Sequence, residues 1–427
     1  MNLLVIGGGG REHAIIQKLR ENPAVETVWC LPGNGGIAAD ATCVPIGAKD
    51  IDAIVDFAKA HPVDFAVVAQ DDPLALGCVD RLHALGIPCF GPDAKAARIE
   101  ASKVFAKDLM KKYRIPTAAY EVFTRAEDAL RYLEGAAFPQ VIKADGLALG
   151  KGVLICQNLE EARAAIRDMM EDKVFGDSGS RVVIESFLTG PEVSVLAFTD
   201  GHTVCPMVSS MDHKRAGDND TGLNTGGMGT VSPNPYYTPA IAEQCMEQIF
   251  LPTIRAMVAE GCPFKGCLYF GLMLTPDGPR VIEYNCRFGD PETQVVLPLL
   301  KTDLLTVMQA VENETLADLD IQWREGAAAC VILASGGYPV HYEKGKEITI
   351  PAGLPANVTV YHAGDKLADG KLFTSGGRVL GVTATADTLP EALKSAYAAA
   401  RSIHFDGAFM RSDIGKRALA AITSMEG

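Results

Sequence analysis

Long apolar runs are missing from this chain of 427 residues, and so is a basic N-terminal segment. The start, Met-Asn-Leu-Leu-Val-Ile, lacks the positive region and the length of a signal peptide, and no stretch approaches the length of a membrane span. Basic residues are outnumbered, and the net charge of −14 argues against a nucleic-acid partner. Anionic substrates are still compatible with it, because local cations and helix N-termini bind phosphate. We expect a cytoplasmic protein that acts on small molecules, without a membrane or nucleic-acid partner.

Paired cysteines are also missing. The 11 cysteines are an odd number, they are scattered, and none forms a Cys-x-x-Cys motif. Most lie in apolar strings, which is typical of small buried side chains in a reducing compartment. Cys262 and Cys267 have no histidine partner at zinc spacing, so a zinc site is not expected. Repeats and low-complexity blocks are absent too, and the length predicts two to four units.

Strand-like and helix-like segments alternate over the first hundred residues. The predicted strands are 2–6, 27–31, 65–69 and 87–90, and the predicted helices begin near Arg11 and cover 50–60 and 74–85. Such alternation predicts a parallel α/β sheet, which we assign to an N-terminal domain at 1–101.

A smaller α+β unit is predicted at 117–188. Its expected strands are 120–123, 141–143, 152–156 and 181–187, with a helix near 160–170 and another that ends at Leu133. Thr124 is the expected N-cap of that second helix, and Glu127 would complete a capping box. A central unit would comprise 102–116 and 189–324, with a helix at 102–113, and a C-terminal α+β domain would follow at 325–427. The long loop from 212 to 235 has no predicted structure, so disorder before ligand binding is an open alternative there.

A hairpin signal at 274–279 precedes the most informative part of the chain, the segment 281–292. If 281–285 is the return strand, Glu283 and Asn285 lie on one face, because alternate strand residues share a face. A carboxylate and an amide oxygen are hard ligands that suit Mg²⁺ rather than zinc. Mn²⁺ is an alternative ion at such a pair. A surface hairpin with solvated charges would be the simpler interpretation of the pair alone, but Arg287, Asp290 and Glu292 follow at once.

The string at 287–294, Arg-Phe-Gly-Asp-Pro-Glu-Thr-Gln, resembles the hallmark of the phosphoribosylamine–glycine ligase family, ATP-grasp enzymes of purine synthesis. Further similar motifs lie at 7–14, 212–215, 224–229 and 411–415, so the resemblance covers the whole chain. It implies an α/β fold with an N-terminal α/β domain, an ATP-grasp lid, a larger ATP-grasp domain and a C-terminal domain. It also implies ATP-dependent ligation of glycine to 5-phosphoribosylamine through glycyl phosphate. We expect a monomer, although no sequence feature fixes the assembly.

Two glycine-rich loops lie where strands end in the N-terminal unit, at 7–10 and 34–36. Glycines between a strand and a helix free N–H groups for phosphate. A dinucleotide is disfavoured, because the third glycine of that fingerprint falls on Glu12 and no acid ends the second strand. Plain turn glycines are the alternative. The resemblance implies that these loops hold phosphoribosylamine. The residues concerned are Gly9, Arg11, Glu12, Gly35 and Gly36.

The segment 143–152 places two lysines around a glycine loop between two predicted strands. Lys143 lies on the strand, where burial without an anionic partner would be costly. Lys151 and Gly150 lie in the loop, which could close over a triphosphate or be an ordinary surface hairpin. Lys103 is a weaker candidate for the same phosphates.

The resemblance assigns further residues. It implies that the strand end at 182–188 reads adenine and ribose, through Glu185, Phe187, Leu188 and Glu192. It implies that the 212–229 loop positions glycine and the amine, through Asp212, Lys214, Asn224, Gly226 and Gly227. Catalytic roles fall to Arg287, Lys143 and Asp212, and Arg287 and Arg411 are candidate substrate contacts.

Three alternatives stay open from the residues. One is another ATP-grasp ligase, such as a biotin-dependent carboxylase subunit. A second is a nicotinamide-dependent dehydrogenase, which the incomplete fingerprint disfavours. A third is a non-catalytic nucleotide sensor, which the set of Lys143, Glu283, Asn285 and Arg287 disfavours. The strand 267–274 carries no acid, so a second Mg²⁺ would need Asp290, Glu292 or phosphate oxygens.

Overall fold

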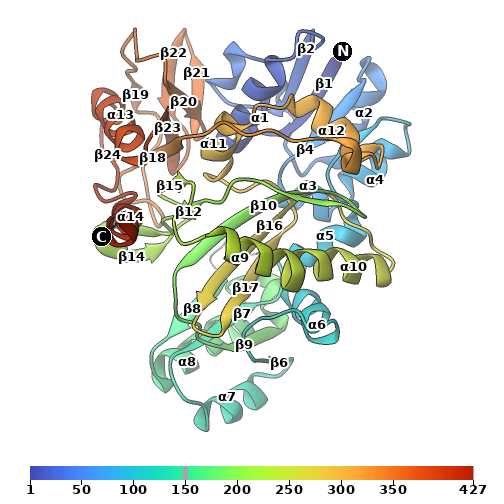
Figure 1. The fold of residues 1–427 in the computed structure, drawn as a ribbon, viewed down its shortest axis with the longest axis vertical. Coiled ribbons are helices and arrows are strands. Elements are labelled where there is room, and N and C mark those ends of the chain that lie inside the picture. Colours follow the sequence, from blue (N-terminus) through green and yellow to red (C-terminus); the bar gives the residue numbers. More distant parts are fainter. Residues whose placement is uncertain (148–151, 427) are drawn as a thin grey trace.

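The computed structural model describes residues 1–147 and 152–426. Three units, the N-terminal unit, the C-terminal unit and the unit of β6 to β9, are arranged around a central sheet (Figure 1). The unit that contains β6 to β9 lies at one end of the molecule. The N-terminal and C-terminal units lie beside each other at the other end. The predicted α/β class is confirmed.

The N-terminal unit is a parallel five-stranded sheet of order β3-β2-β1-β4-β5. Its strands are β1 (Asn2–Gly7), β2 (Thr27–Pro32), β3 (Thr42–Cys43), β4 (Phe65–Val68) and β5 (Cys89–Phe90). Its helices are α1 (Gly10–Arg20), α2 (Ile51–Ala60), α3 (Asp71–Ala75), α4 (Cys78–His83) and α5 (Ala94–Ala101). Residues 3–6 of β1 are fully buried, as expected for a strand covered on both faces.

Two local predictions were wrong. The helix predicted at 74–85 is two helices, because Gly77 has φ +81° and forms the N-cap of α4, a left-handed conformation that ends α3. The helix predicted to begin after Thr124 is α7 (Ala126–Glu134), and its N-cap is Arg125. Arg125 makes no cap bond, so the predicted capping box does not form.

The small unit is an antiparallel sheet of order β6-β9-β7-β8 with two helices. Its elements are β6 (Tyr120–Phe123), α7, β7 (Gln140–Ala144), β8 (Val153–Cys156), α8 (Leu159–Ile166) and β9 (Val182–Ser186). The chain enters this unit from α6 (Lys103–Lys112), which Ser102 caps. A separate apolar core lies between the sheet and its two helices. We refer to this unit as the lid.

The central sheet has the order β11-β10-β16-β17, and all its pairs are antiparallel. Its strands are β10 (Glu192–Asp200), β11 (Val204–Pro206), β16 (Lys265–Thr275) and β17 (Gly278–Asn285). The helices α9 (Pro239–Cys245), α10 (Leu251–Ala259), α11 (Thr293–Val296) and α12 (Leu304–Glu312) flank this part of the chain. The β16–β17 pair is the hairpin expected from the sequence.

The C-terminal sheet has the order β12-β15-β18-β23-β20, and β24 also pairs with β18. Its strands are β12 (Met211–Asp212), β15 (Gly229–Ser232), β18 (Ala327–Ser335), β20 (Val358–His362), β23 (Arg378–Ala386) and β24 (Ala408–Phe409). Nearby lie β19 (Glu347–Ile348), β21 (Asp365–Ala368), β22 (Lys371–Thr374), α13 (Leu389–Ser402) and α14 (Lys416–Glu426). Two of the sheet's strands, β12 and β15, come from the range that the sequence assigned to the central unit.

The loop predicted without structure after Asp212 therefore begins and ends in strands. Between them lies a two-stranded hairpin of β13 (Arg215–Gly217) and β14 (Thr221–Asn224). The segment is therefore paired backbone in the structure and not a loop without secondary structure.

No helix in the described part of the chain combines the length and the apolar character needed to cross a membrane.

Candidate active site

A cavity of about 740 Å³ lies where all four units meet. Its lining includes Asp71 of the N-terminal unit, Lys143 of the lid, Glu283 of the central sheet and Arg378 of the C-terminal sheet. Most of the residues predicted for the site line this one cavity. They are Arg11, Lys103, Lys143, Glu185, Phe187, Leu188, Glu192, Asp212, Lys214, Asn224, Gly226, Glu283, Asn285 and Arg287. Gly150 and Lys151 lie outside the described residues.

Lys143 reaches the cavity from β7 and is held by a buried carboxylate. Its Nζ lies 2.5 Å from Glu185 Oε1 and donates to the Ile282 carbonyl at 3.0 Å. Glu185 Oε2 accepts from Lys107 Nζ at 2.7 Å. Burial lowers the pKa of Lys107 to about 8, and burial also opposes ionisation of Glu185, yet the two lysines lower the pKa of that carboxyl. Glu185, predicted to face adenine, therefore fixes the position of Lys143.

Lys103 adds a second ammonium group at the same wall. Its Nζ donates to the Gly146 carbonyl at 2.9 Å, in the loop after β7. Burial, and then the charge of Lys143, lower its pKa. Two ammonium groups close together in a partly buried cavity favour an anion such as phosphate.

Glu283 and Asn285 are the predicted metal pair, and both line the cavity from β17. They lie opposite Gly271 and Tyr269 of β16, two residues apart, so they share a face as predicted. Lys214 Nζ lies 3.1 Å from Glu283 Oε1, and its charge lowers the pKa of Glu283 to about 2. The carboxylate is thus ionised at neutral pH.

The pair fits a divalent cation only in part. No cluster of three or more His, Cys, Asp or Glu side chains in the described ranges could hold an ion by itself. A carboxylate and an amide oxygen are nevertheless the donor types that Mg²⁺ accepts, and Mg²⁺ usually completes its shell with water and phosphate oxygens. The pair therefore fits an ion that arrives with a nucleotide.

Arg287 lies at the end of β17 and is paired with a residue that the sequence did not suggest. Its Nη2 donates to Glu100 Oε1 at 3.0 Å, and its Nη1 donates to the Phe288 carbonyl at 3.3 Å. Its buried Nε has no hydrogen-bond partner among residues 1–147 and 152–426. The side chain lines the cavity, where its positive charge can attract an anionic oxygen.

Asp212 and Glu292 place two further carboxyl groups at the cavity. Burial, and then Glu292, raise the pKa of Asp212 well above its usual range, and burial raises the pKa of Glu292 as well. Gly227 packs on the Asp212 carboxylate with φ +121°, and a Cβ there would lie 2.6 Å from Asp212 Oδ1. A cation between the two acids would relieve their repulsion.

The glycine loops differ from their predicted role. The N–H of Gly9 donates to Glu12 Oε2 at 2.7 Å, and the N–H groups of Gly35 and Gly36 donate to the Asp365 carbonyl and Oδ1 at 3.3 Å each. These donors are already used by oxygens of the chain itself, so a phosphate nest at these three glycines is not supported. Of the predicted residues in these loops, only Arg11 lines the cavity.

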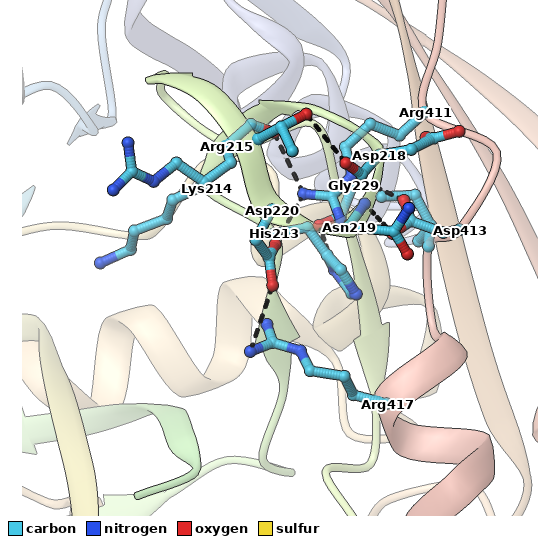
Figure 2. A network of polar contacts seen from close by, with 12 residues as sticks. His213, Lys214, Arg215, Asp218, Asn219, Asp220, Gly229, Arg411, Asp413 and Arg417 are labelled. Carbon is cyan, nitrogen blue, oxygen red and sulfur yellow. Dashed lines mark hydrogen bonds and ion pairs between the residues drawn. The ribbon is translucent and has the colours of Figure 1, made fainter. Parts of the chain in front are cut away.

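Arg411 differs in the same way (Figure 2). Its Nη1 donates to Asp220 Oδ1 at 2.9 Å and to the Arg215 carbonyl at 3.1 Å, and its Nε donates to Asp413 Oδ1 at 2.8 Å. The side chain is 2% exposed and does not line the cavity. The structure does not support the predicted phosphoribosyl contact, because the guanidinium is occupied by the chain's own oxygens.

These contacts fasten the tip of the β13–β14 hairpin to the segment before α14. The Asn219 N–H donates to Asp413 Oδ2 at 2.8 Å, and the Ser412 N–H donates to Asp218 Oδ1 at 2.7 Å. The side chains of Lys214 and Arg215 point away from this cluster (Figure 2), and both line the cavity. The hairpin is thus anchored on one side and exposes cations on the other.

His213 is a structural residue of the same loop. Its Nδ1 donates to the Gly229 carbonyl at 3.0 Å, and its Nε2 accepts from the Gly415 N–H at 3.1 Å. The Gly415 N–H requires an unprotonated Nε2 and therefore a neutral ring. Burial lowers the pKa from 6.5 to about 4. A ring with both nitrogens engaged is not available as a general base.

We expect His213→Gln to reduce the acid sensitivity of the fold. The unfolded state binds a proton below pH 6.5 and the folded state only below about 4, so stability is lost as the pH falls between these values. Glutamine keeps a donor and an acceptor but does not titrate. The drop in unfolding temperature from pH 7.5 to pH 5 should therefore shrink in the variant. His202→Gln, at a side chain 65% exposed, is the control and should keep the wild-type drop. Equal drops in all three proteins would contradict the assignment.

Several residues that line the cavity were not predicted from the sequence. Lys107 lies four residues after Lys103 on α6, and this same-face spacing was a usable signal. Arg378 donates to the carbonyls of Gly226 and Asp290 at 3.0 and 2.8 Å. Arg378 and Glu100 reach the site by tertiary packing, and no local pattern marks either one.

Known proteins resemble this chain along its length. Models of the phosphoribosylglycinamide synthetase N domain, ATP-grasp (A) domain and C domain match residues 1–100, 101–293 and 328–417. The phosphoribosylamine–glycine ligase of Escherichia coli K12 is 49% identical over 98% of this chain and 99% of that protein. That of Vibrio vulnificus YJ016 is 48% identical with the same coverage. The bifunctional purine biosynthetic protein PUR2,5 of Pichia angusta is 49% identical, and the chain spans 54% of its length.

Solved structures of related proteins resemble this chain as well. The phosphoribosylamine–glycine ligase of Thermotoga maritima has a TM-score of 0.85 and 36% identity, and it covers 97% of this chain and 100% of its own. A biotin carboxylase domain of Hydrogenobacter thermophilus, solved with MgADP and bicarbonate, has a TM-score of 0.73 at 16% identity, with 96% and 91% coverage, which shows the fold alone. The chain belongs to the phosphoribosylamine–glycine ligase family and shares the ATP-grasp fold.

Proposed function

We propose that the ATP-dependent ligation of glycine to 5-phosphoribosylamine, the activity of this family, proceeds in the described cavity through glycyl phosphate. One observation carries the proposal. The cavity brings together the ionised Glu283 with the amide of Asn285, the cations Lys103, Lys143 and Arg287, and the carboxyl groups of Asp212 and Glu292, whose pKa values are raised. A triphosphate, its counter-ion and an amino acid need these three kinds of group.

Chemistry requires the activation step. A carboxylate is a poor electrophile, because attack by an amine would have to expel oxide. A glycine carboxylate oxygen bonds to the γ-phosphorus, and the bond from that phosphorus to the bridging oxygen breaks to release ADP. The amine of phosphoribosylamine then bonds to the acyl carbon and loses a proton. Phosphate leaves with the oxygen that came from glycine.

The chain supplies charge and alignment for these steps. Lys103, Lys143 and Arg287 surround the transferring phosphoryl group and compensate its negative charge. Glu283 and Asn285 would hold Mg²⁺, which neutralises phosphate oxygens when bound. Mn²⁺ at this position stays a prediction, as does any second ion at Glu292.

Glycine has an ammonium group that needs an anionic contact. We assign this role to Asp212 and Glu292, which both line the cavity and interact with each other electrostatically. The residues 187–188 and Glu192 follow the wall beyond β9 and would contact adenine and ribose. Closure of the lid over the phosphates would exclude water, which otherwise hydrolyses an acyl phosphate.

Heavy-oxygen labelling tests the intermediate. Glycine labelled in its carboxylate should pass one labelled atom to phosphate in each turnover, because that oxygen attacks the γ-phosphorus. Mass spectrometry of the phosphate measures the transfer. A phosphoenzyme could deliver the same oxygen atom to phosphate at a later step, so the protein must be checked for label as well. We expect no stable label on the protein from γ-labelled ATP. Unlabelled phosphate would exclude the acyl phosphate. Bicarbonate in place of glycine should release no phosphate, and release would favour carboxylase chemistry.

Asp212→Asn should weaken glycine binding specifically. The variant removes one charge from the pair that faces the ammonium group, and we expect the KM for glycine to rise by roughly 10- to 100-fold, the cost of a lost charge-assisted bond. Affinity for Mg-ATP should stay within about twofold, because nucleotide and ammonium contacts lie on different residues. A rise in the KM for ATP with an unchanged KM for glycine would contradict the assignment.

A further inference from the structure

Glu100, near the end of α5, contacts the three successive residues 285–287 of the site. Its Oε2 accepts from the Cys286 N–H at 2.7 Å, and its Oε1 accepts from Arg287 Nη2 at 3.0 Å. When the Asn285 amide is oriented to satisfy both its atoms, its nitrogen donates to Glu100 Oε1 at 3.0 Å and to the Tyr284 carbonyl at 3.2 Å. The Glu100 side chain is 8% exposed, and it too lines the cavity.

The chemistry of a carboxylate decides what these contacts do. Burial raises the pKa of Glu100, and the charge of Arg287 opposes that shift. The ionised form only accepts hydrogen bonds, so Asn285 turns its nitrogen toward it. The amide oxygen of Asn285 then points away from Glu100 and is free for a cation. The same carboxylate pairs with Arg287 and accepts the backbone N–H between the two residues. One side chain thus selects an amide orientation and holds a guanidinium.

A purely structural role would not need this residue type. Burying a charge is costly unless it is paired and hydrogen-bonded, and a neutral side chain could cap the Cys286 N–H. The pairing of α5 with β17 is maintained by an apolar core as well. Asn285 needs a neighbour that accepts hydrogen bonds and donates none, and Arg287 needs a neighbour with a negative charge.

We infer that Glu100 is a positioning residue for nucleotide-bound Mg²⁺, because it fixes the oxygen of Asn285 toward the ion and Arg287 toward the phosphoryl group. The inference rests on the proposed roles of Glu283 and Asn285. The ligand concerned is the Mg²⁺ complex of a nucleoside triphosphate. Glu100 should affect the gain in nucleotide affinity that Mg²⁺ provides. Outer residues of this kind orient ligands, and exchanging them typically costs about 10- to 100-fold in metal affinity or activity.

The test is Glu100→Gln, which adds a donor and removes the charge. Glutamine can donate to the Asn285 oxygen, so the amide can invert and turn its nitrogen toward the ion. We would measure the affinity for a non-hydrolysable ATP analogue with Mg²⁺ and with EDTA. The gain in affinity that Mg²⁺ gives should fall by roughly tenfold or more, the usual loss for such residues. Affinity in EDTA should stay within about twofold.

Asp200→Asn is the matched control. Asp200 is a buried carboxylate that accepts from the backbone N–H groups of His202, Thr203 and Leu316, and it does not line the cavity. It should lower the unfolding temperature and leave the Mg²⁺ gain unchanged. If Glu100→Gln only lowers the unfolding temperature in the same way and keeps the wild-type gain, the inference is wrong.

A second variant changes the other residue of the Glu100–Asn285 contact. Asn285→Asp offers Mg²⁺ a charged ligand, but it removes the donor to Glu100 and places two carboxylates together. We expect a smaller Mg²⁺ gain than in the wild type, and a larger gain would overturn the role of Glu100. Glu283→Gln separates the two hypotheses. If that variant also keeps the full gain, the metal assignment itself fails; if it loses the gain while Glu100→Gln does not, only the Glu100 inference fails.

Discussion

Glu283→Gln should reduce turnover by roughly three orders of magnitude while the protein stays folded. The carboxylate has a pKa of about 2 and is the ionised member of the Glu283–Asn285 pair. Metal-ion stabilisation of a phosphoryl transition state contributes several kcal/mol, and each 1.36 kcal/mol is about tenfold in rate. Glutamine keeps the size of the side chain and one oxygen but loses the charge. Phosphate release at saturating ATP, glycine and phosphoribosylamine measures the effect.

The same variant has a structural consequence that serves as a check. Lys214 lies 3.1 Å from Glu283 and would lose its anionic partner at that position. We expect a modest change in the unfolding temperature, because both side chains are about one-third exposed and solvent screens the pair. Raising the Mg²⁺ concentration should restore part of the activity. Near-wild-type turnover at limiting Mg²⁺ would show that the ion is held elsewhere.

Lys143→Met should lower kcat by roughly 10²- to 10³-fold, the usual cost of removing one preorganised contact to a developing charge. Its ammonium group is placed by Glu185 and the Ile282 carbonyl, so it needs no reorganisation to meet a phosphate. Methionine fills a similar volume. The fold should persist, because Lys107 still pairs with Glu185 at 2.7 Å. Single-turnover rates of ADP formation measure the step.

Lys107→Met is the comparison for that prediction. Lys107 shares the Glu185 carboxylate and donates to Thr117 Oγ1 at 2.7 Å. We expect a smaller loss of kcat than for Lys143→Met, since Lys143 keeps its place beside Glu185. An equal loss in both variants would mean that the charge balance of the cluster, and not the position of Lys143, controls the rate.

The metal hairpin could be predicted from the sequence because its signals are local. The turn, the strand and the two-residue spacing of Glu283 and Asn285 lie within a few residues of one another. The parallel N-terminal sheet could also be predicted, because strand-like and helix-like segments alternate along the first hundred residues. The resemblance to a known family then supplied most of the other predicted residues that line the cavity.

The predictions that the structure does not support have the opposite cause. Gly35 and Gly36 look like an anion loop until Asp365, more than 300 residues away, takes their N–H groups. Arg411 looks like a free cation until Asp220 and Asp413 surround it. Glu100 has no local pattern at all. Each of these side chains is defined by a partner distant in sequence, and composition and spacing carry no information about such a partner.

The anchored hairpin also has a consequence in time. The Asn219 N–H and its acceptor Asp413 are separated by 194 residues of chain. At roughly 5–20 residues per second, synthesis places about 10–40 s between them. During that interval the hairpin has left the ribosome without its anchor, while the N-terminal sheet and the lid can already form. The cations on the hairpin therefore take their final positions after most of the nucleotide-binding wall exists. A nascent chain should acquire the capacity to bind ATP before it acquires the capacity to use glycine.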